Sequence, residues 1–287
     1  MLRVVRLLAP NPGVYTLEGT NTWVVGANPS IVIDPGPDLE EHLDTVAREA
    51  EPVAAVLVTH DHPDHAPGAL RVAERVRAPV FAYRLAGAER LRAGQRIRGG
   101  GVELTTVHTP GHTSDHAAFF EPVSGSLFTG DAVVGRGTSF IDPPDGDLIR
   151  YLRSLDRMLE LEPRTIYPGH GPVVLRAREK LKEYRDHRHE REEQLVDALA
   201  QGPRTIPQLV GSIYADYPDD VRPLAARSVL AHLLKLEHEG RAERAARNEE
   251  GPWTSSTPSA CERCGRRVTG RARYCSSCSL AILQGEE

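Results

Sequence analysis

The feature that most constrains this chain is a loop of seven residues that carries three histidines and two aspartates. Residues 59–65 read Thr-His-Asp-His-Pro-Asp-His, and they directly follow an apolar run at residues 53–58. A short apolar run is typical of a buried strand, so the histidines come where a strand ends and a loop begins. Nitrogen and oxygen donors on such a rigid base suit a divalent cation. The sequence therefore predicts a metal site here, in preference to a His-rich surface turn.

Length and composition describe an ordinary globular protein. A chain of 287 residues is long enough for a main domain and one or two small ones. Its net charge of −5 gives no global excess of Lys and Arg to attract nucleic-acid phosphates, although a local basic patch is compatible with that total. Residues 1–6 are too short and too interrupted by arginine for a signal peptide, and no apolar run approaches the roughly 18 residues of a membrane span. We therefore expect a cytoplasmic protein with no membrane partner.

Apolar periodicity divides the first 174 residues into alternating strands and helices, which predicts an α/β fold with helices packed on the faces of a sheet. Strands are expected at residues 2–8, 14–17, 20–26, 30–34, 53–58, 79–83, 101–108, 117–120, 125–131 and 165–167. Helices are expected after residue 37 through about residue 50, at residues 66–78, and at residues 148–161.

Three later motifs also place a histidine or an aspartate after a strand-like segment. They are Pro-Gly-His at residues 110–112, Thr-Gly-Asp at 129–131 and Pro-Gly-His at 168–170. Ligands in α/β folds characteristically lie in loops at strand ends, so the four motifs would converge on one edge of the fold. The candidate ligands are His60, His62, Asp64, His65, His112, Asp131 and His170. This is the inventory of a dinuclear hydrolytic centre, in which two cations about 3.5–4 Å apart activate a water and polarise a substrate oxygen.

The order and form of these motifs closely resemble the metallo-β-lactamase fold superfamily over roughly residues 10–175. The resemblance implies an αββα sandwich, with two mixed sheets face to face and the metals in a groove at one edge. It also implies two zinc ions, or other divalent ions, in the active site. The ligands carried over by motif are His60, His62 and His112 on one metal, Asp64, His65 and His170 on the other, and Asp131 as a bridge.

Two aspartates have further roles implied by the resemblance. Asp34, at the end of the strand expected at residues 30–34, matches an early aspartate of the family and would fix the ligand loop by hydrogen bonds from behind. Asp64 would be the catalytic residue that orients a hydroxide bridging the metals, which attacks phosphorus or a carbonyl carbon. A metal-bound carboxylate is a weak base, so help from Asp64 in proton transfer is secondary.

Several segments resemble the β-lactamase-like protein 2 branch, among them residues 16–23, 111–116, 167–172 and 184–191. That branch includes a metal-dependent endoribonuclease, which implies phosphodiesters of single-stranded RNA as the substrate. Glyoxalase II thioesterases share Thr20, Asn21, Thr22 and all the metal ligands, so a hydroxyacyl-glutathione thioester or another small ester stays the alternative. Residues 132–138 lack the Cys-Gly-Lys/Arg-Phe type of segment with which that family binds glutathione. Substrate-binding residues stay unassigned. Arg136 and Thr138, soon after Asp131, are candidates to meet a phosphate, and the alternative for both is a purely structural role in the loop.

Residues 175–247 predict a small winged-helix-like domain. A long charged helix at residues 175–200 precedes helices at 206–214 and 223–240, and residues 241–247 have the character of a strand or wing. Its charge is nearly balanced, which favours a scaffold beside the active site or a homodimer surface over a DNA reader. The third functional alternative is nonetheless a nucleic-acid-binding regulator with a vestigial metal site. Residues 248–260, rich in Gly, Pro, Ser and Thr, are expected to form a linker.

The four cysteines of the chain are all in the C-terminal tail, in two Cys-x-x-Cys pairs. Cys261, Cys264, Cys275 and Cys278 predict a structural tetrathiolate zinc in a ribbon over residues 261–278. A segment this short cannot bury a core, so the metal would supply its folding energy. The alternative is a redox or disulfide role. The arginines between the pairs would touch RNA or a protein partner, or form a solvated loop.

Seven other histidines are outside the metal motifs, and the sequence supports an expectation for five of them. His108 and His116 neighbour the second loop and are expected to pack or to form supporting hydrogen bonds. His42, His232 and His238 are in helical segments and are expected at the surface.

Overall fold

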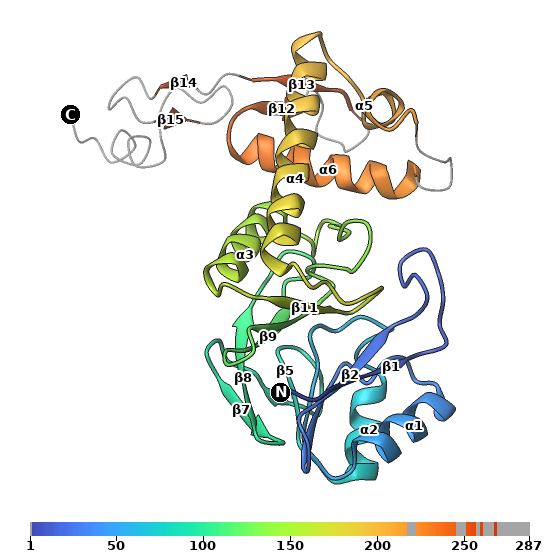
Figure 1. The fold of residues 1–287 in the computed structure, drawn as a ribbon. Helices are drawn as coiled ribbons and strands as arrows, with labels where there is room; N and C mark the ends of the chain where they lie inside the picture. The colour runs from blue at the N-terminus through green and yellow to red at the C-terminus, as the bar shows by residue number, and fades with distance from the viewer. Residues whose placement is uncertain (1, 217–221, 245–250, 257–258, 261–266, 269–287) are drawn as a thin grey trace, which may run out of the picture. The chain divides into compact units, whose positions relative to one another are not determined.

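The computed structural model describes residues 2–216, 222–244, 251–256, 259–260 and 267–268. The chain divides into two compact units, residues 1–139 with 144–185, and residues 140–143 with 186–287 (Figure 1). The sequence places a domain boundary after residue 174, whereas this division lies within helix α4 (Ala177–Ala200). The four cysteines of the proposed zinc ribbon lie outside the described residues.

The first unit contains two mixed sheets. One has the strand order β1-β2-β3-β4-β5-β6 and the other β11-β10-β9-β8-β7. Strands β3 to β6 pair in parallel, as do β10 and β11, and the remaining pairs are antiparallel. The strand bounds are β1 (Val4–Leu8), β2 (Asn21–Val25), β3 (Ser30–Ile33), β4 (Val53–Leu57), β5 (Val80–Ala82), β6 (Glu89–Arg90), β7 (Arg96–Gly99), β8 (Val102–His108), β9 (Ala117–Glu121), β10 (Ser126–Gly130) and β11 (Thr165–Pro168).

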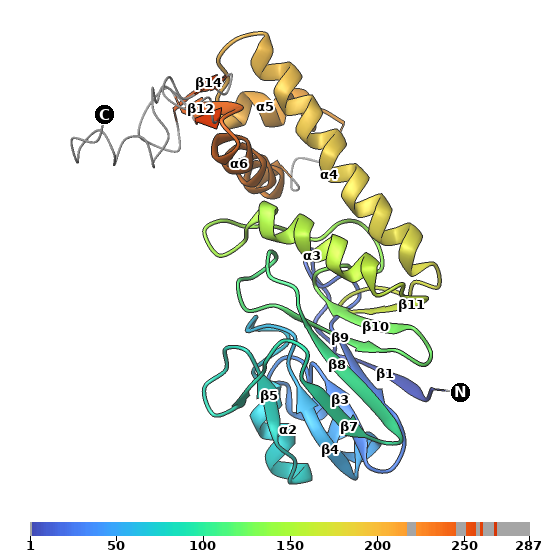
Figure 2. The same cartoon turned by 90° about the vertical axis from the view of Figure 1, so that its left-hand side faces the viewer.

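Alternating side chains of the central strands build the two sides of the core. Val32 and Val56 pack with the apolar faces of helices α1 (Glu40–Ala50) and α2 (Gly68–Val76), while Ile33 and Leu57 pack with Phe119 of the opposite sheet. Helix α3 (Leu148–Glu160) is on the outside of the second sheet (Figures 1 and 2). The two sheets thus face each other, and helices cover the outer face of each. The predicted αββα sandwich is confirmed.

The prediction of a strand at residues 14–17 is wrong. Only a single bridge joins Gly13 to Leu17, and Leu17 has a left-handed backbone conformation with φ 55°. The Thr16 hydroxyl donates to the carbonyl of Asn11 at 2.6 Å, so the segment bonds to itself instead of to a sheet. The short strands β6 and β7 were not predicted, because residues 89–99 are arginine-rich and have no apolar alternation. Such edge strands are specified by their pairing partners.

The second unit is a helical module with a two-stranded wing. Two further helices, α5 (Ile206–Ile213) and α6 (Arg222–His238), follow α4, and strand β12 (Ala242–Arg244) pairs antiparallel with β13 (Trp253–Ser255). Strands β14 (Ser259–Ala260) and β15 (Arg267–Val268) form a separate pair. Among the described residues, no helix is both long enough and apolar enough to cross a membrane.

The prediction of a linker at residues 248–260 is wrong for strand β13, the second strand of this wing. Trp253 is fully buried in the core of the second unit with Leu233 and Leu236 of α6. Its backbone exchanges hydrogen bonds with Arg204, and the guanidinium of Arg244 lies 4.8 Å from the centroid of its ring. Composition predicts a linker, but one aromatic residue that fills the core makes strand β13 part of the domain.

Two histidines expected at the surface are buried. His42 of α1 lies with its Nε2 atom 3.0 Å from the hydroxyl of Thr22. His232 of α6 is fully buried, and neither ring nitrogen has a hydrogen-bond partner among the described residues. Burial, together with the charges of Arg188 and Lys235, holds the pKa of His232 well below its usual value. Only His238 is exposed as expected.

We predict that His232 makes stability depend on pH. Its folded pKa is depressed, so the unfolded chain binds more protons once the pH drops below about 6.5, and stability falls with pH from there. The free energy of unfolding should decrease by about 2 kcal/mol more in the wild type than in His232→Leu between pH 7 and pH 5. Urea unfolding at both pH values measures this. His238→Leu is the control, and an equal pH dependence in all three proteins would contradict the prediction.

We also predict that Trp253→Ala destabilises the second unit by about 3–5 kcal/mol, the usual cost of emptying a core aromatic site. The exposed Ser255 of the same strand gives the control Ser255→Ala. Denaturant unfolding followed by the fluorescence of a probe in the second unit would report both variants. If residues 248–260 were a linker after all, the two substitutions would be equally mild.

Candidate metal centre

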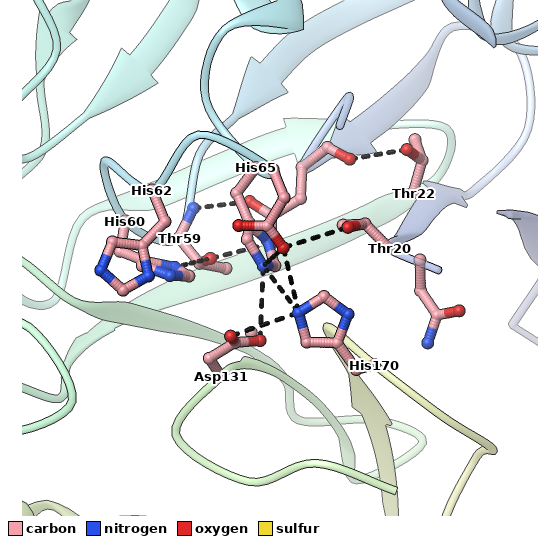
Figure 3. Close-up of polar contacts among 12 residues, drawn as sticks. Thr20, Thr22, Thr59, His60, His62, His65, Asp131 and His170 are labelled. Atoms are coloured by element: carbon pink, nitrogen blue, oxygen red, sulfur yellow. Dashed lines mark hydrogen bonds and ion pairs between the residues drawn. The ribbon is translucent and has the colours of Figure 1, made fainter. Parts of the chain in front are cut away.

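Four strand ends bring the seven predicted ligands together. The loop after β4 holds four of them, and the loops after β8, β10 and β11 hold one each. Side-chain donor atoms fall into two groups, in each of which all donor atoms lie within 4.8 Å of one another (Figure 3). The first group is His60, His62, His112 and Asp131, and the second is Asp64, His65 and His170. The division matches the one that the family resemblance implies, and the role of these residues as metal ligands stays a prediction.

Asp131 lies between the two groups. Its carboxylate oxygens are 3.4 Å from His65 Nε2 and 3.3 Å from His170 Nε2. On the other side, Asp131 Oδ2 is 3.8 Å from His112 Nε2. A carboxylate in this place can offer one oxygen to each of two cations, which fits the expected bridging role.

The donor atoms of the first group suit a cation. His60 Nε2 and Asp131 Oδ1 are buried and have no hydrogen-bond partner among the described residues, and such atoms are costly to leave unpaired. His62 Nδ1 and His112 Nε2 lie 3.2 Å apart and so face the same point. Burial and the imidazoles of His65 and His112 hold the pKa of His60 well below its usual value. Its ring is therefore neutral, which is the form that binds metals.

The second group concentrates negative charge. Burial alone would lower the pKa of His65, but the carboxylates of Asp64 and Asp131 outweigh it and hold that pKa well above its usual value. They likewise overcome burial at His170 and raise its pKa to about 9. Burial would raise the pKa of Asp64, yet His65 and His170 hold it well below its usual range. Protons on the two imidazoles balance the carboxylates here, and a divalent cation would do so in their place.

Asp34 lies behind the ligand loop. Its Oδ1 atom accepts from the backbone N–H of Thr59 at 2.7 Å, and its Oδ2 atom accepts from the Thr59 hydroxyl at 2.8 Å. The same Oδ2 atom is 2.9 Å from His65 Nδ1. Asp34 has a left-handed backbone conformation with φ 50°, which is uncommon outside glycine and is held here by these bonds.

The segment before β2 supports the second group, a function that sequence reasoning missed. The Thr20 hydroxyl donates to Asp64 Oδ2 at 3.1 Å, and Asn11 holds Thr20 through two bonds of 2.9 Å. The carbonyl of Gly19 lies 3.1 Å from His170 Nδ1 and leaves Nε2 facing the cluster. The sequence marks Thr20 only as a residue shared with related families. No local pattern connects this segment with residues some 44 or 150 positions away.

A second supporting network joins the loops of the first group. Asp115 Oδ2 accepts from the backbone N–H of Asp61 at 3.1 Å, and Asp115 Oδ1 lies 3.3 Å from the guanidinium of Arg84. Arg84 also reaches Asp145 at 3.4 Å. These contacts tie the loop after β4 to the loop that carries His112. No sequence motif announced them.

The two histidines beside the second loop are outside both ligand groups, as expected. His108 packs on the ring of Tyr83, with 4.6 Å between ring centroids. His116 Nδ1 lies 2.8 Å from the hydroxyl of Thr109, and its ring lies 5.0 Å from that of His60. Their contacts are those of packing and supporting hydrogen bonds.

Comparison with known proteins identifies the fold. Residues 15–170 match the metallo-beta-lactamase superfamily. The chain belongs to this superfamily. It is accordingly a metal-dependent hydrolase, and residues 205–253 match the beta-lactamase associated winged helix domain.

Relatives of this superfamily member extend over both units. A beta-lactamase-like protein 2 homolog of Drosophila melanogaster is 34% identical over 83% of this chain and 89% of its own length. An atrochrysone carboxyl ACP thioesterase of Aspergillus chevalieri is also 34% identical, over 82% of this chain and 80% of its own length. A beta-lactamase domain protein of Burkholderia ambifaria has the same fold, with a TM-score of 0.75 at 22% identity over 89% of this chain and 91% of that one.

We predict that the first unit binds about two divalent ions. Elemental analysis is best done in a Cys261→Ser/Cys264→Ser background, which removes any zinc in the tail. In that background His112→Ala should lower the metal content by about one ion per chain, because it removes one ligand of the first group. His108→Ala is the matched control and should retain the full content. Equal metal content in His112→Ala and His108→Ala would contradict the ligand assignment.

Proposed function

We propose that the protein is a dinuclear metal-dependent hydrolase that cleaves phosphodiester bonds of single-stranded RNA. The observation that carries the proposal is the presence of two adjacent donor groups with Asp131 between them. A second group that includes Asp64 is more typical of the phosphodiesterase and thioesterase branches of the superfamily than of β-lactam hydrolases. The similarity to beta-lactamase-like protein 2 homologs along most of the chain favours the first of those two branches.

The proposed metal ligands are His60, His62 and His112 for one ion, Asp64, His65 and His170 for the other, and Asp131 for both. When bound, the two ions supply an activated water and stabilise the negative charge that develops on the substrate. The residues of the chain position these groups. The supports behind the ligands keep each ring and carboxylate in one orientation before substrate arrives, and such preorganisation is what makes a polar site catalytic.

Asp64 orients the attacking water in this proposal. The Thr20 hydroxyl fixes Asp64 Oδ2 at 3.1 Å, and His65 and His170 keep the pKa of the carboxyl well below its usual range against the effect of burial. The carboxylate therefore stays ionised at neutral pH and can only accept hydrogen bonds. It can hold a water by accepting one of its protons in a hydrogen bond, but it takes up that proton poorly.

Thioester hydrolysis is the second candidate. One relative, which aligns over 80% of its own length, is named as an atrochrysone carboxyl ACP thioesterase. The pairing of two arginines beside the site also favours a substrate of low charge. Arg84 is paired with Asp115 and Asp145, and Arg136 is paired with Glu18. Because these carboxylates neutralise them, neither arginine adds much positive potential to attract a polyanion.

A nucleic-acid-binding regulator with a vestigial site is the least supported alternative. A winged-helix domain that reads DNA places an exposed helix in the major groove. Here Val229, Leu233 and Leu236 of α6 lie in the core of the second unit, and Lys235 is paired with Glu192 and Glu239. Few side chains of this helix remain to contact a groove.

The C-terminal cysteines keep their predicted role as a proposal. Cys261, Cys264, Cys275 and Cys278 would hold one structural zinc, because four thiolates leave no open position for chemistry. This ion would fold the tail and would take no part in hydrolysis.

A side-by-side assay tests the substrate. Purified protein loaded with divalent metal is offered a fluorescently labelled single-stranded RNA oligomer, the same oligomer in duplex form, a hydroxyacyl-glutathione thioester and an acyl carrier protein thioester. We expect the single-stranded RNA to be cleaved, and we expect this cleavage to stop once a chelator has removed the metal. Intact RNA with a cleaved thioester would establish the second candidate instead.

A matched pair of aspartate variants tests the role of Asp64. On whichever substrate is cleaved, Asp64→Asn should lower kcat by about 10²–10⁴-fold, because the amide no longer holds the water by a charged acceptor. Asp61→Asn changes an exposed carboxyl of the same loop and should retain activity. Metal content is measured for both proteins. Unchanged turnover in Asp64→Asn would remove this residue from the mechanism.

A further inference from the structure

The hydroxyl of Thr59 connects the two ligand groups through a shared carboxylate. Thr59 Oγ1 lies 2.8 Å from Asp34 Oδ2 and 2.9 Å from His60 Nδ1. The same Asp34 oxygen lies 2.9 Å from His65 Nδ1. Figure 3 shows Thr59 beside His60 and His65 at the end of the loop. One oxygen atom of Asp34 thus reaches His65 of the second group directly and His60 of the first group through Thr59.

The direction of each hydrogen bond follows from the chemistry of the groups. An ionised carboxylate can only accept, so the single hydroxyl proton of Thr59 points to Asp34. The Thr59 oxygen is then an acceptor, and the neighbouring ring of His60 must donate to it from Nδ1. A neutral imidazole carries one proton, so His60 Nε2 has a lone pair. That Nε2 atom is the buried one that lacks a hydrogen-bond partner among the described residues.

His65 is oriented by the same carboxylate without an intermediary. Its Nδ1 atom donates to Asp34, which directs Nε2 toward the cluster, 3.3 Å from Asp64 and 3.4 Å from Asp131. The hydrogen bond from Nδ1 to Asp34 would therefore orient the ring for a cation bound at Nε2. His60 and His65 therefore have equivalent support, and only His60 depends on Thr59 for it.

Packing keeps water from taking the place of this hydroxyl. The residues Asp34 and Thr59 are each only 1% exposed. Gly130 lies directly against the Thr59 side chain, because a Cβ atom at this glycine would come within 2.5 Å of Thr59 Oγ1. Gly130 also has a φ of 47°, which disfavours a larger residue. The Thr59 hydroxyl is therefore enclosed on the side of Gly130 and shielded from bulk solvent.

We propose that Thr59 is a positioning residue that extends the acceptor of Asp34 to His60, so that one carboxylate orients a histidine in each ligand group and, through Thr59, sets the tautomer of His60. The proposal rests on the metal ligands of the proposed function. It does not depend on which substrate is cleaved. It also gives a physical reason for a hydroxyl residue directly before His60.

Two substitutions at position 59 separate the hydroxyl from the packing. Thr59→Val keeps the branched shape and removes the hydroxyl, and Thr59→Ser keeps the hydroxyl and removes a methyl group. The first experiment uses full-length metal-free protein with ¹⁵N-labelled histidine, with the His60 signals assigned from His60→Gln. Long-range ¹H–¹⁵N correlation spectra report which nitrogen of His60 carries the proton. We expect Nδ1–H in the wild type and in Thr59→Ser, and a loss of that state in Thr59→Val.

The second experiment measures the two metal affinities by competition with a chelator. Thr59→Val should weaken the ion that His60 binds by about 10–100-fold, the usual effect of losing an outer hydrogen-bond partner, and should weaken the ion that His65 binds much less. Thr59→Ser should stay close to the wild type. A merely structural role would weaken both ions, and would affect Thr59→Ser at least as much.

The outcomes distinguish this proposal from the proposed function. A His60 ring protonated at Nε2 in the wild type would overturn the proposal whether or not the variants fold. Nδ1–H retained in Thr59→Val would overturn it as well. Wild-type protein with Nδ1–H at His60 but no affinity for divalent ions would refute the proposed metal site, while the hydrogen-bond relay would stand.

Discussion

The close approach of Asp131 to imidazoles of both donor groups is the contact on which the rest of the first unit depends. Gathering carboxylates and imidazoles into a buried volume is costly unless each charge has a partner or binds a metal. The structure holds them at short range because Asp131 follows β10 and His170 follows the parallel neighbour β11. Glycines make that approach feasible. A Cβ atom at Gly169 would lie 2.4 Å from Asp131 Oδ1, so no other residue fits beside the carboxylate.

How much of this site the sequence can predict depends on how far apart its residues are along the chain. The loop at residues 59–65 combines a strand end with four ligands in one short segment, so local pattern was enough to find it. His112, Asp131 and His170 each follow an apolar segment and could be found in the same way. The residues that hold the ligand loops in place by hydrogen bonds could not be found from local pattern. Asn21 donates to the carbonyls of Pro168 and Gly171 at 2.9 Å, across about 150 residues of chain, and only the folded topology brings them together.

The errors in the second unit have a related physical origin. Composition alone made residues 248–260 a linker, because Gly, Pro, Ser and Thr outnumber the apolar residues there. A single Trp253 decides otherwise, since burying one large aromatic side chain can outweigh a run of weak local preferences. The sequence predicts His232 at the surface because its helical segment shows no partner for the imidazole. Its position on α6, between Leu230 and Leu233 that pack in the core, was the signal that could have placed it inside.

The metal centre and the choice of substrate are set by different parts of the molecule. In the proposed mechanism the donor groups, Asp34 and Thr59 would serve the reacting centre, and phosphodiesters and thioesters both present an oxygen on which negative charge develops. Binding energy that discriminates between them must come from contacts farther out. Two arginines beside the loops of the site, Arg84 and Arg136, already have carboxylate partners, so a polyanionic RNA would have to displace Glu18 or Asp145 to use them. Those ion pairs would have to open for these arginines to select RNA, whereas the orientation of the metal ligands would serve either substrate.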